Sequence, residues 1–293
     1  MYAPDAARRI SGSTGLVALL GDPVEHSLSP AIHNAAFAAD GLDLVYVACS
    51  VSTGRLRDAV AGLDALGARG ANVTIPHKEA VLPLVAGRSP EVEAVGAANT
   101  LVRGPGGWRA HNTDVAGFLA PLEPHVRSLA GGEALVLGAG GAARAVVYAL
   151  LTRMQPSRLT VAARRPAQAE ALAASLAPFD ARAALAVSTL DALPPARLRA
   201  AALVVHTTPV GVGSDASLLP ADAFAPGQIA YDLAYRPDGT RYLHDAAGRG
   251  ATAIGGLPML VAQAAAAYQL WTDRPMPLDA VHAALASRLD TRA

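Results

Sequence analysis

The stretch Ala134-Leu135-Val136-Leu137-Gly138-Ala139-Gly140-Gly141-Ala142-Ala143-Arg144 decides the fold of this 293-residue chain. Its apolar start predicts a buried strand, its glycines allow a tight turn, and its alanine-rich end predicts a helix. This is a G-x-G-x-x-A turn in the strand-to-helix context that dinucleotide binding requires, with a helix N-terminus for the phosphates. We expect a pyrophosphate against Gly138, Ala139, Gly140, Gly141 and Ala142; the alternative is a turn with a purely structural role.

The end of the next expected strand indicates which dinucleotide binds. Leu159–Ala163 is followed by Arg164 and Arg165, and the nearest acidic residue, Glu170, comes further along the chain. An acidic residue at this strand end holds the ribose 2′-hydroxyl of NAD, whereas an arginine suits a 2′-phosphate. The sequence therefore favours NADP(H) as cofactor, with Arg164 as the better candidate than Arg165. The alternative is that one or both arginines are solvated surface charges.

Strands and helices alternate along the rest of the chain, which predicts an α/β fold with mostly parallel sheets. The expected strands are 16–20, 44–51, 70–75, 100–103, 108–111, 134–137, 159–163, 202–206 and 229–233. The expected helices are 30–40, 55–66, 140–153, 167–176, 257–271 and 278–289.

We expect two α/β domains. Residues 1–114 with 257–293 form one domain, and residues 115–256 form a Rossmann-type nucleotide-binding domain. The C-terminal helices then pack back on the first domain.

Composition excludes several classes of protein. Lys+Arg and Asp+Glu each number 24, so there is no net charge to attract nucleic acid. The single cysteine, Cys49, excludes an internal disulfide, and its apolar surroundings predict a small core residue. The longest apolar helix, expected over 257–271, is too short to cross a bilayer. We therefore expect a cytoplasmic protein, a monomer or a homodimer, without metal, nucleic-acid or membrane partners.

Lys78 is the only lysine, and the other 23 of the 24 Lys and Arg residues are arginines. Arginine cannot lose a proton near neutral pH, whereas a lysine can when its surroundings lower its pKa. A lone lysine in an arginine-rich chain is therefore a candidate proton-transfer group, although chance survival of one surface lysine is the alternative. Asn72-Val73-Thr74-Ile75-Pro76-His77-Lys78 predicts a strand running into a proline-started helix, with Lys78 in its first turn.

Other small polar groups are expected at strand ends and helix starts. In Ser27-Leu28-Ser29-Pro30, Ser29 is expected to cap a helix, and both hydroxyls could bind a small carboxylate there. Asn99 precedes a strand, and Asp114 follows another. Asp114 could equally cap a helix that starts at Val115.

Eight motifs in order and spacing resemble the shikimate dehydrogenase family. They are Ser27–Pro30, Asn72–Lys78, Gly96–Thr100, Asn112–Asp114, Gly138–Ala142, Thr207–Gly211, Tyr231–Tyr235 and Gly256–Gln263. The resemblance covers roughly residues 17–271. It implies reversible reduction of 3-dehydroshikimate to shikimate with NADPH.

The resemblance also implies residue roles. Ser27 and Ser29 would hold the substrate carboxylate, with Tyr235 lining that end. Lys78, paired with Asp114, would be catalytic, because an ammonium can stabilise and protonate the oxygen that hydride attack makes negative. The substrate hydroxyls would bind Thr74, Asn99, Asp114 and Gln263. The cofactor's nicotinamide would meet the backbone near Leu233 and Gly256, and its 2′-phosphate would meet Arg164.

Three positions depart from the family's usual pattern. His206 stands where Asn is usual, and we expect a satisfied strand-end histidine rather than a new catalytic group. Ala163 stands where Asn is usual, which weakens the assignment of the 2′-phosphate contacts. Pro258 stands where Gly is common.

Three rival functions stay open. One is a relative that oxidises quinate or an aminated shikimate analogue, with NADP or with NAD. Another is a non-catalytic nucleotide-binding regulator that kept the fold. The third is a two-lobed dehydrogenase acting on folate carriers, which would leave the serine pair unexplained.

Overall fold

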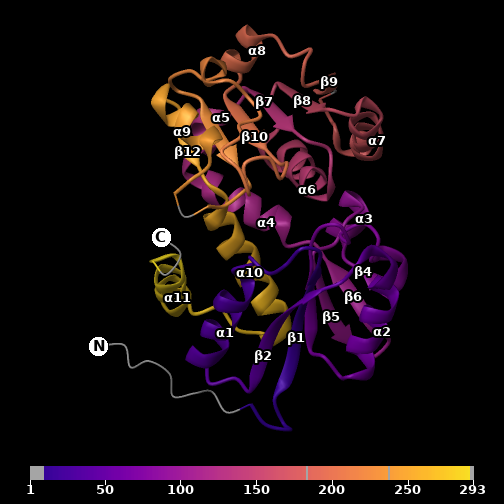
Figure 1. The fold of residues 1–293 in the computed structure, drawn as a ribbon. Coiled ribbons are helices and arrows are strands. Elements are labelled where there is room, and N and C mark those ends of the chain that lie inside the picture. Colours follow the sequence, from indigo (N-terminus) through magenta and orange to yellow (C-terminus); the bar gives the residue numbers. More distant parts are fainter. Residues whose placement is uncertain (1–9, 183, 237, 291–293) are drawn as a thin grey trace. The chain divides into compact units, whose positions relative to one another are not determined.

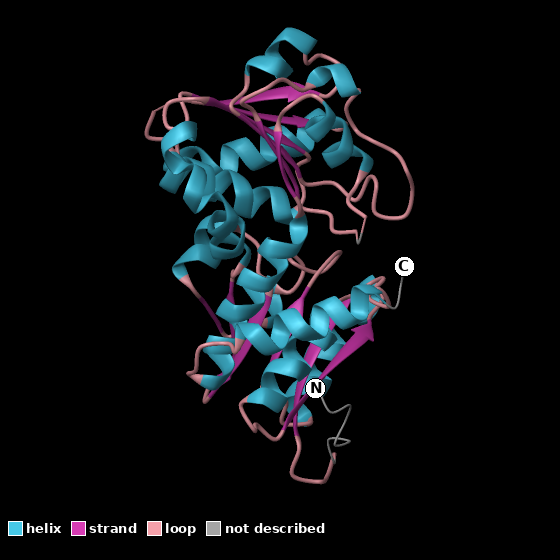
Figure 2. Ribbon diagram, turned by 90° about the vertical axis from the view of Figure 1, so that its left-hand side faces the viewer, coloured by secondary structure: helices cyan, strands magenta, loops and turns pink. Residues whose placement is uncertain are grey.

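The computed structural model describes residues 10–182, 184–236 and 238–290, and these divide into two compact units. Unit 1 comprises the described residues up to Ser89, Ala98–His111 and those from Ala264 onward. Unit 2 comprises Pro90–Ala97 and Asn112–Gln263. The predicted domain limits, at 114/115 and 256/257, stay a prediction. In each unit the strands form a sheet with helices beside it, as the magenta and cyan ribbons show (Figure 2).

The sheet of unit 1 is mixed. Its strands follow the order β2-β1-β3-β5-β6-β4; β5 runs antiparallel to β3 and β6, and the other neighbours are parallel. Because β5 is reversed, Asn99 at its start lies at the same sheet edge as the carboxyl end of β3. The strands are β1 (Gly15–Gly21), β2 (Leu44–Ser50), β3 (Gly70–Val73), β4 (Gly87–Arg88), β5 (Thr100–Gly104) and β6 (Gly107–His111).

The helices of unit 1 are α1 (Ser29–Ala39), α2 (Leu56–Ala65), α11 (Leu278–Asp290) and the second half of α10 (Gly256–Thr272). Helices α1 and α11 pack side by side (Figure 1). From α10, the Tyr268 ring stacks on Phe37, and the Trp271 indole nitrogen donates to the Leu101 carbonyl at 3.0 Å. The expectation that the C-terminal helices pack back on the N-terminal elements is confirmed.

Unit 2 has an all-parallel sheet in the order β12-β11-β10-β7-β8-β9. Strand order reverses between β7 and β10, and ligands of such sheets bind in the crevice at that point. Along β7, Ala134 and Val136 join one buried core, while Leu135 and Leu137 join a core on the opposite face. Burial on both faces explains why this strand is an unbroken apolar run. The strands are β7 (Glu133–Leu137), β8 (Arg158–Ala163), β9 (Leu185–Thr189), β10 (Leu203–His206), β11 (Ile229–Asp232) and β12 (Thr252–Ile254).

The helices of unit 2 connect these strands. They are α3 (Pro90–Val95), α4 (Asp114–Leu119), α5 (Val126–Leu129), α6 (Gly141–Ala149), α7 (Pro166–Leu176), α8 (Pro195–Ala200), α9 (Arg241–Gly248) and the first half of α10. A wider π-helical turn, Leu150–Met154, prolongs α6.

The structure corrects some expectations. Strands β4, β9 and β12 were not predicted: β4 and β12 have only two and three residues, and β9 is half-buried along its whole length. Cys49 is half-buried rather than a core residue, because β2 is an edge strand. Burial raises the pKa of its thiol. No helix in the described ranges is long and apolar enough to cross a membrane.

Candidate active site

Lys78 lies in a turn after β3, and the predicted helix at this position is wrong. Its carbonyl accepts the Ala98 N–H at 2.8 Å, a tertiary bond in place of a helical one. The neighbouring His77 ring is fully buried and bonds through Nε2 to the Val51 carbonyl at 2.6 Å. These bonds hold the backbone on both sides of the Lys78 Cα. The half-buried Lys78 side chain therefore extends from a turn whose main chain is anchored to two other segments.

A buried chain of hydrogen bonds joins the serine motif to Asn99. The Ser29 hydroxyl donates to the Tyr46 phenol, which donates to Asn72 Oδ1 at 2.7 Å. Asn72 Nδ2 donates in turn to the carbonyl of Asn99 at 3.0 Å and to Thr100 Oγ1 at 3.1 Å. Burial raises the pKa of Tyr46 far above its ordinary value, so its phenol stays a proton donor. These hydrogen bonds join Ser29 and the main chain of Asn99, two of the predicted substrate-binding residues, in one buried network.

The expected capping role of Ser29 is wrong by one residue. Helix α1 begins at Ser29, its N-cap is Leu28, and no side chain of the described residues caps it. Ser29 is turned to Tyr46 instead, and its N–H donates to Ser27 Oγ at 3.2 Å. Pro30 lies in the first turn, as predicted.

Thr74 is pressed against Gly21 at the end of β1. A Cβ on Gly21 would come within 2.3 Å of Thr74 Cγ2. The Thr74 N–H donates to the Leu20 carbonyl at 2.9 Å, and its own carbonyl accepts from the His77 N–H at 2.8 Å. Glycine at position 21 therefore lets the turn that carries Thr74 and Lys78 lie against β1.

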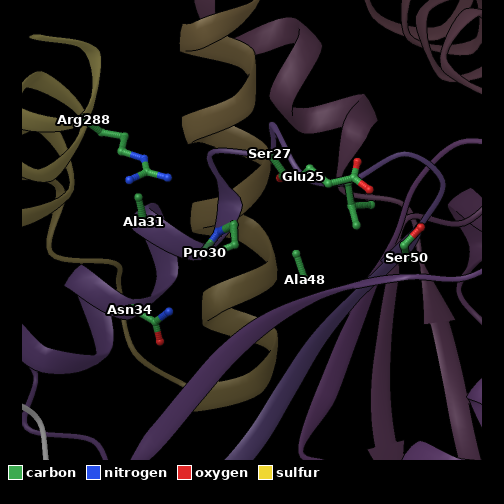
Figure 3. A pocket seen from close by; sticks show the side chains of 9 residues that line it. Glu25, Ser27, Pro30, Ala31, Asn34, Ala48, Ser50 and Arg288 are labelled. Carbon is green, nitrogen blue, oxygen red and sulfur yellow. The ribbon is translucent and has the colours of Figure 1, made fainter. Parts of the chain in front are cut away.

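A cavity of about 520 Å³ opens beside the start of α1 (Figure 3). Its volume is in the range of small-molecule sites. Ser27 lines it, so this hydroxyl can be reached by a small polar ligand. The lining residues are Val24, Glu25, Ser27, Pro30, Ala31, Asn34, Ala48, Ser50 and Arg288.

In unit 2, Asp114 and Gln263 are carried by two helices in close contact. Asp114 opens α4 and is 5% exposed, and its N–H donates to Asn112 Oδ1 at 3.1 Å. Asp114 is thus the first helical residue, and the possibility that it caps a helix starting at Val115 is wrong, since the N-cap is Thr113. One turn later, a Cβ on Gly117 would lie 2.7 Å from Gln263 Cβ. Gly117 therefore allows α4 to approach α10 closely at Gln263.

The predicted glycine turn lies between β7 and α6, at the switch point of the sheet. Gly138 has φ +119°, and a Cβ there would come within 2.4 Å of Thr207 Oγ1. A Cβ on Gly140, the N-cap of α6, would meet no described atom within 4 Å. The first N–H groups of a helix lack helical partners and carry its positive dipole end. Open space beside Gly140 is compatible with a ligand at this helix start, and the binding of a pyrophosphate by Ala139, Gly141 and Ala142 stays a prediction.

Arg164 and Arg165 are exposed between β8 and α7. Ala163 ends β8 and is paired with Thr189 of β9. Two guanidinium groups at this strand end fit the two charges of a 2′-phosphate.

The predicted nicotinamide contacts come together at one backbone crossing. The Gly256 N–H donates to the Ala234 carbonyl at 3.2 Å, and a Cβ on Gly256 would come within 2.2 Å of the Leu233 carbonyl oxygen. Glycine is therefore required where α10 begins. Tyr235 follows and is half-buried.

His206 has the structural setting that we expected. It is 1% exposed, and both ring nitrogens have partners: Nδ1 lies 3.0 Å from Asp232 Oδ1, and Nε2 lies 2.6 Å from Thr208 Oγ1.

Sequence reasoning missed Tyr46, Asn72 and His77 as residues that position others. Their positions on strands or in a turn predict no such role, since each acts through a partner at least 26 residues away in the chain. The paired action of Lys78 and Asp114, which belong to different units, stays a prediction.

Comparison with known proteins shows what this chain resembles. The model of the shikimate dehydrogenase substrate binding domain matches residues 19–101, and that of the shikimate 5′-dehydrogenase C-terminal domain matches residues 256–286. The chain is 53% identical, over 282 residues, to a shikimate dehydrogenase (NADP(+)) of Salinibacter ruber. That alignment covers 94% of this chain and 98% of the relative.

Solved structures agree with the sequence relatives. A shikimate dehydrogenase in complex with NADP+ matches with a TM-score of 0.88 and 32% identity, over 96% of this chain and 98% of that one. The shikimate 5-dehydrogenase of Thermus thermophilus, in complex with NADP(H) and shikimate, matches with a TM-score of 0.82 and 38% identity. This second match covers 94% of this chain and 99% of the other.

Proposed function

The chain belongs to the shikimate dehydrogenase family, and from this premise we propose that it catalyses the reversible, NADPH-dependent reduction of 3-dehydroshikimate to shikimate. The observation that carries the proposal is 53% identity, over nearly the whole of both chains, to an enzyme named for shikimate and NADP+. It is therefore an NADP-dependent oxidoreductase. Action in the cytoplasm, as a monomer or homodimer, belongs to the proposal as well.

Lys78 is the proton donor in the proposed reaction. When bound, NADPH supplies the hydride that adds to the ketone carbon of the substrate. Negative charge develops on the ketone oxygen, and the Lys78 ammonium stabilises that charge and transfers a proton to the oxygen. Asp114 accepts a hydrogen bond from the adjacent substrate hydroxyl and orients it. The anchored backbone around Lys78 supports this role, because a proton donor must be held in place.

The remaining polar residues orient the substrate. The hydroxyls of Ser27 and Ser29 bind its carboxylate, together with Tyr235. The buried bonds from Ser29 through Tyr46 to Asn72 support a preorganised rather than a flexible site. The substrate hydroxyls bind Thr74, Asn99, Asp114 and Gln263.

Backbone donors and two arginines bind the cofactor. The N–H groups of Ala139, Gly140, Gly141 and Ala142 face the pyrophosphate, and the open space at Gly140 supports this. Gly138 gives the cradle its tight turn, since its own N–H donates to the Ala162 carbonyl at 2.8 Å. Arg164, with Arg165 beside it, binds the 2′-phosphate and so selects NADP(H) over NAD(H). The backbone at Leu233 and Gly256 borders the nicotinamide.

The direct test follows absorbance at the reduced-nicotinamide band, with shikimate and either NADP+ or NAD+. We expect NADPH formation, with a kcat/KM for NADP+ at least about tenfold above that for NAD+, the discrimination that charged hydrogen bonds to a phosphate supply. A parallel series with quinate tests the rival substrate. Absence of turnover with shikimate would contradict the proposal, and nucleotide binding without any turnover would favour the non-catalytic alternative.

A further inference from the structure

A buried hydrogen-bond network lies at the carboxyl ends of β10 and β11, and the proposed chemistry gives no role to its side chains, those of His206, Thr208, Asp232 and Thr240. Asp232 is fully buried and its carboxylate accepts three bonds. The donors are His206 Nδ1 at 3.0 Å, the Ala234 N–H at 3.0 Å and the Thr240 hydroxyl at 2.5 Å. Each donor comes from a different segment, so one carboxylate joins the end of β10, the loop after β11 and the start of α9.

The hydrogen-bonding capacity of these groups determines where the proton of His206 lies. An ionised carboxylate only accepts, so Nδ1 of His206 carries the proton that it donates to Asp232. Nε2 then accepts from the Thr208 hydroxyl at 2.6 Å, while Thr208 Oγ1 accepts the Val210 N–H at 3.3 Å. With its proton on Nδ1, His206 therefore gives every group in the network a hydrogen-bond partner.

The His206 ring is held in this orientation by an aromatic face. Tyr242 stacks on it with ring centroids 5.2 Å apart, and the Tyr242 hydroxyl donates to the Val204 carbonyl at 2.9 Å. Because a packed aromatic ring covers it, the imidazole cannot turn away from its two partners without disrupting the core.

The segments that His206 joins are those that border the predicted nucleotide site. Thr207, its neighbour, donates N–H and hydroxyl to the carbonyl of Leu137, the residue before Gly138. On the other side, the Leu233 N–H donates to the His206 carbonyl at 3.0 Å. His206 thus links the glycine turn with the Leu233–Ala234 loop that Gly256 contacts.

The loop after β10 depends on His206 at one end. Its far end is held by Arg236, whose Nη1 donates to the carbonyls of Gly211 and Ser214 at 3.3 and 2.8 Å. The near end is held by the bond between Thr208 and Nε2 of His206. Loss of that bond loosens the loop at Thr208, whose Cγ2 would lie 3.0 Å from a Cβ on Gly138, while Thr207 keeps its two bonds to Leu137.

We propose that His206 is a positioning residue for the cofactor, which holds the Thr208 loop and the Leu233–Ala234 loop in the conformation that binds NADP(H). The proposal rests on the proposed function for the identity of the ligand. His206 touches neither substrate nor cofactor in this account and acts through Thr208 and Asp232. Its loss therefore weakens nucleotide binding and leaves the proton-transfer step unchanged.

The test compares nucleotide affinity in matched variants of the full-length protein. His206→Phe keeps the ring that stacks on Tyr242 and removes both nitrogens, whereas His206→Asn keeps a shorter group that can still donate and accept. Gln228→Met is the control, because Gln228 is a buried residue that immediately precedes β11, at the opposite end of that strand from Asp232, and its Nε2 donates to the carbonyls of Leu198 and Ala201. Calorimetry gives Kd for NADP+, and steady-state rates give kcat and both KM values.

We expect His206→Phe to raise Kd for NADP+ about tenfold, the effect of one or two lost hydrogen bonds. His206→Asn raises it about two- to threefold. In both variants kcat and KM for shikimate stay within about twofold, and Gln228→Met lowers Tm while leaving Kd unchanged. An unchanged Kd in His206→Phe, or an equal rise in Gln228→Met, would overturn the proposal. If His206→Phe does not fold, an unchanged Kd in His206→Asn overturns it equally.

A second measurement uses the wild-type protein. Nitrogen-15 NMR of its eight histidines resolves the tautomer of each ring, and the His206 signal is identified by its loss in His206→Asn. The bond from His206 to Asp232 requires the proton on Nδ1, and a proton on Nε2 alone would overturn the assigned network. If the wild type binds NADP+ without oxidising shikimate, the proposed function fails while the Kd comparison still decides the role of His206.

Discussion

Two strand-end turns, one in each unit, hold their sites by different means. The turn after β7 is open: a Cβ on Gly140 would meet no described atom within 4 Å, and backbone N–H groups are its proposed functional part. The turn after β3 is crowded: Lys78 is held by bonds to Ala98 and, through His77, to Val51. Backbone N–H groups can bind the phosphates of a cofactor that many proteins use. Anchored side chains, by contrast, can be arranged to bind one substrate and to transfer a proton to it.

The largest expected effect tests whether the crowded turn carries the chemistry. Lys78→Ala and Lys78→Arg remove the only ammonium, and we expect kcat to fall by about 10²–10⁴ because the proton donor is lost. Kd for NADP+ stays near the wild-type value, since the open turn is untouched. Steady-state rates and calorimetry measure the two effects. Wild-type turnover in either variant would remove Lys78 from the mechanism.

Glycine substitutions test the two turns independently. Gly138→Ala forces a Cβ against Thr207 at φ +119°, and Gly21→Ala forces one against Thr74. We expect each to lower the unfolding free energy by about 1–3 kcal/mol, Gly138→Ala through backbone strain and overpacking and Gly21→Ala through overpacking. Gly138→Ala raises Kd for NADP+, whereas Gly21→Ala raises KM for shikimate.

Gly140→Ala is the matched control for stability, because its Cβ meets no described atom. Its unfolding free energy, from urea titration, should stay within about 1 kcal/mol of wild type. If Gly138→Ala were equally well tolerated, the contact with Thr207 would not constrain the turn.

These contrasts explain what could be predicted from the sequence. The glycine turn was predicted correctly because residue type alone determines where backbone can take φ +119° or approach a phosphate. The turn at Lys78 was mistaken for a helix because its conformation depends on bonds to Ala98 and Val51, which no local pattern reveals. Tyr46 was missed for the same reason. Local rules predict backbone sites, whereas sites of buried side chains require the fold.

Removing a positive charge at the end of β8 should have a smaller effect, on the preference for NADP+ over NAD+. Arg164→Ala removes a cation from the predicted 2′-phosphate site, so we expect kcat/KM for NADP+ to fall about tenfold while that for NAD+ changes less than twofold. Arg165→Ala is the paired variant and should have the weaker effect. The two cofactors are compared in the same assay with shikimate. Equal losses with NADP+ and NAD+ would show that Arg164 does not bind the phosphate.

The smallest effect at neutral pH concerns His33, which packs against Tyr46 of the buried hydrogen-bond chain between Ser29 and Asn72. Its ring stacks on Tyr46, and neither ring nitrogen has a hydrogen-bond partner among the described residues. Burial lowers the pKa of His33 to about 3 from 6.5. Between these two pH values, His33 is protonated in the unfolded chain but not in the folded one. The unfolding free energy therefore falls as pH falls, by about 1.4 kcal/mol per pH unit.

His33→Phe removes this penalty. We expect the variant to match or exceed wild-type stability at pH 7.5 and to exceed it by a further 2 kcal/mol or so at pH 5. Urea titrations at both pH values measure the difference. Parallel pH profiles for the two proteins would mean that His33 is protonated in the folded state.

The most direct test of the account uses the single lysine. An amine-directed reagent can modify Lys78 and the α-amino terminus, and mass spectrometry follows the rate at each site. We predict that shikimate slows modification of Lys78 at concentrations near its KM and leaves the terminus unchanged as an internal control. Equal rates at Lys78 with and without saturating shikimate would contradict the claim that this amine meets the substrate.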